Sequence, residues 1–172
     1  MDKPLSNTDM VTALGSNGEP ITYSQLKSYS FIEELLPSVG SFKVILIRDQ
    51  PSSGHWVALV RHAENEYFYF NSYGESYNQD LYLVPAMVRK MLGNYDNTLK
   101  ELLRDKKVAY NNVKFQQNGS SVCGRWVVLF IIMTTKMLYT MPEFIHFVKE
   151  KKKELHYKKY DELVLHLTSN IR

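Results

Sequence analysis

Residues 116–133 read QQNGSSVCGRWVVLFIIM, and this stretch decides how the chain folds. A polar loop rich in Gly and Ser leads into Cys123, and the residues after Arg125 are apolar as far as Met133. A helix that is apolar nearly all round belongs in the interior of a protein. The pattern therefore predicts a buried helix that begins at Cys123, with the other elements packed around it.

The elements on either side are predicted from the spacing of apolar residues and from capping and turn residues. Helices are expected over 5–14, 22–36, 83–103, 141–154 and 159–168, the third of them interrupted near Gly93 and Asn94, and strands over 42–47, 56–61, 67–70 and 108–115. Short turns join the first three strands, which favours antiparallel pairing. Helices, a mostly antiparallel central sheet and further helices predict an α+β fold in a single domain of residues 1–172, with a basic helical segment at 141–172.

The composition limits where the protein works. A chain of 172 residues with 44% apolar residues can bury one sizeable core. Its single cysteine excludes an intramolecular disulfide, which favours a reducing compartment over secretion. We expect no signal peptide, because Met1 leads into a polar segment. The longest apolar run, Trp126–Met133, is far shorter than the roughly 20 residues of a membrane span, so we expect no membrane association.

The net charge of +3 is small, but the positive charge is concentrated near the C-terminus. Six lysines and two glutamates lie between positions 149 and 159. Such a run is most often a solvated helix face. The alternative is a contact with nucleic acid or an acidic partner through Lys149, Lys151, Lys152, Lys153, Lys158 and Lys159.

Cys123 is the candidate nucleophile. A lone cysteine is usually a small buried apolar residue. This one, however, follows a Gly/Ser loop and opens the most apolar helix of the chain. The N-terminus of a helix carries partial positive charge and free N–H groups, which favour a thiolate.

A thiolate nucleophile needs an imidazole as its partner, and His55 is the best placed of the five histidines. It stands at the mouth of a predicted strand, after a Ser-Ser-Gly turn, whereas the others lie in a charged turn or in the C-terminal helices. If 56–61 and 67–70 form a hairpin, Asn71 at the end of the second strand is a neighbour of His55. An Asn carbonyl can fix the tautomer of such a histidine, although Asn71 by itself is more typical of a strand-to-turn cap.

The tetrahedral intermediate of acyl transfer also needs donors for its oxyanion. The backbone N–H of Cys123 is one candidate, and a side-chain amide is a common second. Gln116 and Gln117 stand just before the nucleophile loop, at the end of a predicted strand. Both are candidates.

Together these residues resemble the adenain-like maturation cysteine proteases, above all the members from virophages and large DNA viruses, and more distantly the ubiquitin-like-protein proteases. Three stretches carry the resemblance, which covers about residues 20–140. Residues 54–58 (GHWVA) are similar to the family's His-Trp strand. Residues 70–74 (FNSYG) are similar to its third-residue motif. Residues 116–124 are similar to its Gln-loop-Cys-Gly motif.

The resemblance implies a papain-like or adenain-like fold with the nucleophile at the N-terminus of a buried helix. It implies a catalytic triad of His55, Asn71 and Cys123, and a substrate cleft narrowed by Trp56. The family spacing also bears on the doubled glutamine. Seven positions before the cysteine, as in the adenovirus enzyme, selects Gln116, and Phe115 before it fits this choice. Six positions, as in the ubiquitin-like-protein proteases, selects Gln117.

The implied function is a cysteine endopeptidase that processes viral capsid and other structural precursors during virion maturation, at sites containing glycine. We expect it to act as a monomer, without a cofactor or metal, in the virion and at the assembly site in the host-cell cytoplasm. One alternative is a protease that removes ubiquitin or a ubiquitin-like modifier. Another is a non-enzymatic DNA-binding or capsid-binding protein that retains the fold, for which the basic segment is the only support.

Overall fold

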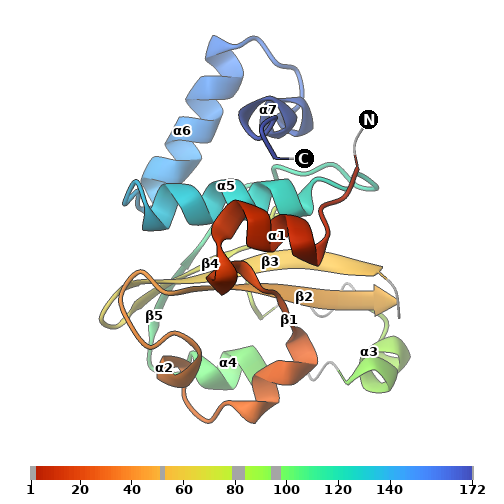
Figure 1. The fold of residues 1–172 in the computed structure, drawn as a ribbon, viewed down its shortest axis with the longest axis vertical. Helices are drawn as coiled ribbons and strands as arrows, with labels where there is room; N and C mark the ends of the chain where they lie inside the picture. Colours follow the sequence, from red (N-terminus) through yellow and green to blue (C-terminus); the bar gives the residue numbers. More distant parts are fainter. Residues whose placement is uncertain (1–2, 51–52, 79–83, 94–97, 172) are drawn as a thin grey trace.

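The computed structural model describes residues 3–50, 53–78, 84–93 and 98–171. Within these residues, five strands form one mixed sheet in the order β1-β2-β3-β4-β5. The strands are β1 (Ile21–Thr22), β2 (Phe42–Gln50), β3 (Ser53–Ala63), β4 (Glu66–Phe70) and β5 (Lys107–Tyr110). The sheet is the middle layer of the molecule, with helices on both faces (Figure 1).

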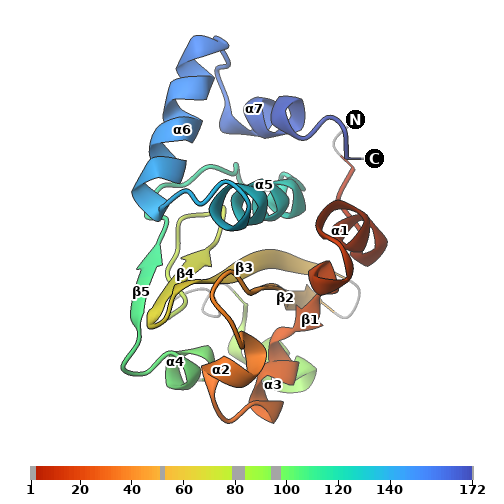
Figure 2. The same ribbon diagram turned by 60° about the vertical axis from the view of Figure 1, so that its left-hand side comes forward.

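The helices divide between the two faces of the sheet, as both ribbon views show (Figures 1 and 2). On one side of the sheet lie α1 (Asn7–Leu14) and α5 (Cys123–Thr135), and α6 (Met141–Glu154) and α7 (Tyr160–Leu167) pack on α5 farther from the sheet. The other carries the 3-10 helix η2 (Tyr23–Ser28), α2 (Ile32–Leu35), α3 (Ala86–Leu92) and α4 (Thr98–Leu102). A second 3-10 turn, η1 (Ser16–Gly18), follows α1. The predicted α+β class is therefore confirmed.

The central strand β3 separates two hydrophobic cores. Its side chains alternate between the faces, so that Ala58 and Val60 join the core around α5, while Val57 and Leu59 join the core on the opposite face. All four are buried, as expected for a strand covered on both sides. The helix predicted to begin at Cys123 does so, and it packs directly against β3.

The sheet is mixed, so the expectation of a mostly antiparallel sheet is wrong in part. The three predicted strands β2, β3 and β4 pair antiparallel, as their short turns require. The outer strands pair parallel, β1 with β2 and β5 with β4. Each of these outer pairs is joined by a long connection that contains helices, which is what parallel pairing needs.

The single helix predicted over 22–36 is also wrong. The segment begins in β1, continues as η2, passes through an extended Tyr29 and ends as α2. Tyr23 and Ile32 are both buried in the second core, yet nine residues of straight α-helix would place them on opposite faces. The break at Tyr29 lets both side chains enter the same core.

The helical stretch predicted over 83–103 forms with the predicted interruption near Gly93. It consists of α3 and α4, and Gly93 ends α3 in the left-handed conformation at φ 76°. Residues 83 and 94–97 of that stretch lie outside the described residues. The strand predicted over 108–115 stops at Tyr110. In the part of the chain that the structure describes, no helix combines the length and apolar character needed to cross a membrane.

Candidate active site

His55 and Asn71 meet at one end of the sheet. His55 lies near the start of β3, and Asn71 directly follows β4, its antiparallel neighbour. The distance from His55 Nε2 to Asn71 Oδ1 is 2.6 Å. A carbonyl oxygen only accepts, so Nε2 must carry the donated hydrogen, and Nδ1 of the neutral ring is then the basic nitrogen.

Asn71 is held by a side chain that no sequence pattern singled out. The backbone N–H of Asn71 donates to Asn111 Oδ1 at 3.0 Å, and Asn111 Nδ2 donates back to the Asn71 carbonyl at 2.6 Å. Both residues are fully buried. The carboxamide of Asn111 thus replaces the next rung of the β4–β5 ladder. This also explains why β5 ends at Tyr110.

Tyr73 covers the imidazole. Ala58 pairs with Phe70 in the antiparallel register, so the position opposite His55 is that of Tyr73. The two rings stack with their centroids 4.7 Å apart and an interplanar angle of 28°. Burial lowers the pKa of His55 to about 4, against the opposing effects of the Asn71 hydrogen bond and the Asp49 charge. At neutral pH the ring is therefore uncharged and able to accept a proton.

Cys123, the first residue of α5, lies at the same end of the sheet. It is buried in the core that contains Trp56, the neighbour of His55. A Cβ atom on Gly124 would come within 3.3 Å of Trp56 Cδ1 and 2.9 Å of Met10 Cε, so only glycine leaves room for this close approach. Burial raises the pKa of Tyr73, and a thiolate at Cys123 would raise it further. Cys123 thus lies within electrostatic range of the aromatic ring that covers His55.

The two candidate glutamines differ in their surroundings. Gln116 is 1% exposed, whereas Gln117 is exposed. Ser72 Oγ donates to Gln116 Oε1 at 2.6 Å, and Gln116 Nε2 donates to the carbonyl of Ser120 at 2.7 Å. These bonds turn the amide nitrogen toward the nucleophile loop. Since that nitrogen carries two hydrogens, one bond does not exhaust its capacity as a donor.

The loop after β4 and the segment before Cys123 are joined by backbone hydrogen bonds. The Ser72 carbonyl accepts from the N–H groups of Phe115 at 2.8 Å and Gln116 at 3.0 Å. Gly74 has φ +80°, and a Cβ there would lie 2.9 Å from the Val113 carbonyl carbon. The residue next to Asn71 therefore fixes the position of Gln116. Neither Ser72 nor Asn111 could have been found from the sequence, because each acts on a residue at least 40 positions away.

The arrangement has the groups that acyl transfer to a thiol requires. It combines a thiol, a neutral imidazole, an amide that orients the imidazole and a buried amide donor. The first-turn N–H groups of α5 add further donors, because the apolar side chain of its N-cap residue Val122 cannot accept from them. Within the described residues, no group of three or more His, Cys, Asp or Glu side chains could hold a metal ion.

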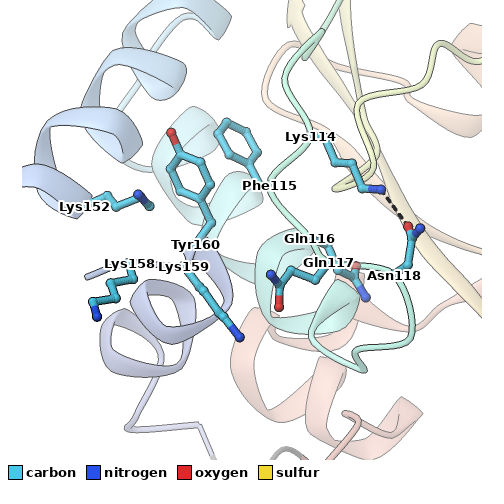
Figure 3. Close-up of a pocket in the computed structure, with 9 residues that line it drawn as sticks. All are labelled: Lys114, Phe115, Gln116, Gln117, Asn118, Lys152, Lys158, Lys159 and Tyr160. Carbon is cyan, nitrogen blue, oxygen red and sulfur yellow. Dashed lines mark hydrogen bonds between the residues drawn. The ribbon is translucent and has the colours of Figure 1, made fainter. Parts of the chain in front are cut away.

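The other residues predicted to have a role, Trp56 and the lysines of the basic segment, do not all lie together. Trp56, expected to narrow a substrate cleft, is 8% exposed and belongs to the core. The six lysines of the basic segment do not share one face. Lys152, Lys158 and Lys159 join Lys114 around a cavity of about 620 Å³ beside Gln116 and Gln117 (Figure 3). Lys149 lies at a different cavity, and Lys151 forms an ion pair with Glu154 at 3.1 Å.

Comparison with known proteins adds two similarities. No known family model matches the chain. Among solved structures, the crystal structure of the ASFV pS273R protease is similar with a TM-score of 0.35 and 20% sequence identity. This similarity covers 60% of the chain and 37% of that protease, so the chain corresponds to little more than a third of its length.

The second similarity is to a virophage protein, described as "Uncharacterized protein V9" of Sputnik virophage. The two sequences are 30% identical over 145 residues, which make up 82% of each chain. The aligned part is thus most of both proteins and includes most of the fold described above. The chain belongs to the same protein family as protein V9 of Sputnik virophage.

Proposed function

We propose that this protein is a cysteine endopeptidase in which Cys123 is the nucleophile, His55 its base and Asn71 the residue that orients the base. The observation that carries the proposal is the 2.6 Å bond from His55 Nε2 to Asn71 Oδ1, next to the helix that begins with the chain's single cysteine. A Cys-His pair whose imidazole is fixed by an Asn carbonyl is a known arrangement for peptide hydrolysis.

The reaction would proceed by acyl transfer. His55 Nδ1 takes the thiol proton as the Cys123 sulfur forms a bond to the substrate carbonyl carbon. The resulting oxyanion accepts hydrogen bonds from the Cys123 N–H and from Gln116 Nε2. When the intermediate collapses, the C–N bond breaks and His55 gives its proton to the leaving amine. His55 then activates a water, which hydrolyses the thioester and releases the acid and the free thiol.

We further propose that the substrates are viral structural precursors, including capsid precursors, cleaved at sites that contain glycine during virion maturation. Two observations support this assignment. The chain belongs to the same family as a virophage protein, and its three sequence motifs resemble those of maturation proteases. The place of action would then be the virion and the assembly site in the host-cell cytoplasm. The protein would act there as a monomer.

Incubation of the purified protein with the capsid precursors of its own virus tests this function. We expect discrete fragments whose new termini, identified by mass spectrometry, lie at or next to glycine. Protein alkylated beforehand with iodoacetamide is the matched control and should give no fragments. Cleavage of conjugates with a Gly-Gly-ended modifier but of no capsid precursor would overturn the substrate class and leave the chemistry standing. Equal cleavage by the alkylated protein would overturn the chemistry.

A further inference from the structure

A basic pocket lies beside the proposed active site, and we call it the lysine pocket. Its volume is about 620 Å³. Lysines reach it from separate parts of the chain: Lys114 from the segment after β5, Lys152 from α6, and Lys158 and Lys159 from the connection to α7 (Figure 3). Three of the six lysines of the basic segment therefore line one concave site.

The charge of the lysine pocket is not neutralised by its own walls. Among the described residues that line it, none is acidic. Lys114 Nζ donates to the neutral Asn118 Oδ1 at 2.6 Å, and Lys152 Nζ lies 5.0 Å from the centroid of the Tyr160 ring. Lys151, on the same helix, has instead a carboxylate partner in Glu154. Several cations around one cavity raise the local concentration of an anionic ligand.

An acidic residue does lie close to the pocket, but it is directed elsewhere. Asp161 follows Tyr160, is only 9% exposed, and accepts from the backbone N–H of Gln117 at 3.3 Å. This bond holds the backbone of Gln117, which lines the pocket. Asp161 itself is not among the residues that line it. Apart from the aromatic side chains of Phe115 and Tyr160, the side chains that line the pocket thus carry ammonium groups or neutral amides.

The lysine pocket shares a wall with the proposed reaction centre. Gln116 and Gln117 both line it, and Gln116 is the proposed donor to the oxyanion. Lys114 Nζ also lies 5.6 Å from the centroid of the Tyr73 ring, which stacks on His55. A polypeptide held at Cys123 therefore passes close to the mouth of the pocket.

We propose that the lysine pocket binds an acidic segment of the polypeptide substrate, close to the scissile bond, and so selects among substrates. This role rests on the proposed function. The lysines surround a cavity and do not form a row, whereas a nucleic acid strand is tracked by charges along a groove. The common wall with the reaction centre, where a polypeptide must lie, favours a peptide ligand over a nucleic acid.

Binding to the Cys123→Ala protein tests the pocket without any need for catalysis. The probe is a fluorescein-labelled peptide with four consecutive glutamates, and its partner has four glutamines in their place. We expect at least tenfold tighter binding of the glutamate peptide, weakening with added salt. The preference should disappear in the triple variant Lys152→Gln, Lys158→Gln, Lys159→Gln. Lys114 is left unchanged because it contacts the ring that covers His55.

The matched control is the triple variant Lys149→Gln, Lys151→Gln, Lys153→Gln. It loses the same charge from the same segment, outside the lysine pocket. It should keep the preference for glutamate. Equal losses in the two triple variants, or equal binding of the two peptides, would overturn the proposal. So would a single-stranded oligonucleotide that binds through the pocket lysines when the glutamate peptide does not.

A cleavage assay separates this proposal from the proposed function. A peptide library with randomised cleavage positions is prepared with either four glutamates or four glutamines at its flank. We expect a kcat/KM at least tenfold higher with the glutamate flank, lost in the pocket variant. Equal values for the two flanks would overturn substrate selection and leave the protease intact. Binding of the glutamate peptide without cleavage of any library member would overturn the protease and leave the pocket as an acidic-peptide site.

Discussion

The protonation of His55 governs what the proposed site can do. Tyr73 stacks on its ring, and burial disfavours the imidazolium and lowers the pKa of His55 to about 4. A base is useful only in its neutral form, and the folded protein keeps His55 neutral over most of the acidic range. Asn71 also selects the His55 tautomer that carries its hydrogen on Nε2, because the side-chain carbonyl of Asn71 accepts from that nitrogen.

The pH dependence of kcat/KM reports this pKa directly. Activity should be retained as the pH falls from 7 and be lost with a midpoint near 4, since kcat/KM follows the ionisation of the free enzyme. The Tyr73→Ala variant should shift the acid limb upward, toward the ordinary histidine value of 6.5, because its ring no longer shields the imidazole. An acid limb near 6.5 in the unmodified protein would show that the ring is solvated.

The same pKa affects stability. The unfolded chain takes up a proton at His55 near pH 6.5, whereas the folded protein does so only near pH 4, so stability falls as the pH drops between these values. The loss at the lower end is about 3 kcal/mol. Urea unfolding at pH 7 and pH 4 measures it. The His55→Gln variant should show a smaller difference between the two pH values.

The doubled glutamine gives a matched pair of variants. Gln116 is buried and oriented by Ser72, whereas the side chain of Gln117 is exposed. Gln116→Ala should lower kcat on the order of 100-fold, about 3 kcal/mol, with little change in KM, since it removes a donor to the transition state. Gln117→Ala should change kcat by less than about threefold. A large loss in Gln117→Ala alone would transfer the role to that residue.

At the scale of elements, the site depends on how β4 and β5 end. The ladder between them continues past Tyr110 through a side chain, because Asn111 binds both backbone groups of Asn71. One residue further on, the Ser72 carbonyl receives two N–H groups from the segment that carries Gln116. A parallel pair of strands thus sets the distance between the residue that orients the base and the proposed oxyanion donor.

Asn111→Ala tests this coupling. The change leaves a buried N–H and a buried carbonyl of Asn71 without that partner, which costs about 1–3 kcal/mol of unfolding free energy. We also expect kcat to fall at least tenfold with KM nearly unchanged, and the acid limb of the pH profile to move, because Asn71 no longer holds His55 in place. Asn112→Ala, an exposed neighbour, is the control for both readouts. A loss of stability with unchanged kinetics would assign Asn111 a structural role only.

Across the whole molecule, the spacing of apolar residues and the short turns predicted those helices and strands whose formation depends on residues close together in the sequence. The apolar run after Cys123, the antiparallel strands over 42–47, 56–61 and 67–70, and the helix over 141–154 all form. The parallel outer strands could not be predicted, because parallel pairing depends on the path of a long connection. Asn111 and Ser72 could not be predicted either, because their partners are 40 and 44 residues away.

The two layers of helices explain why the site lies where it does. Figure 1 shows α5 lying across the sheet on one side, and Cys123 is the first residue of this helix. Within the sheet, the antiparallel strands β3 and β4 bring His55 and Asn71 together. We propose that these residues form a proteolytic centre with Cys123 as its nucleophile.

The turnover of the Cys123→Ala variant on a protein substrate tests that claim most directly. Replacing the CH2SH side chain by a methyl group removes a single sulfur atom from a small buried side chain, so the circular dichroism spectrum should match that of the unmodified protein and the unfolding temperature should change by only a few degrees. Proteolysis should fall at least about 1,000-fold, to the background of the assay. Cleavage at the rate of the unmodified protein, by a variant with this intact fold, would contradict the claim.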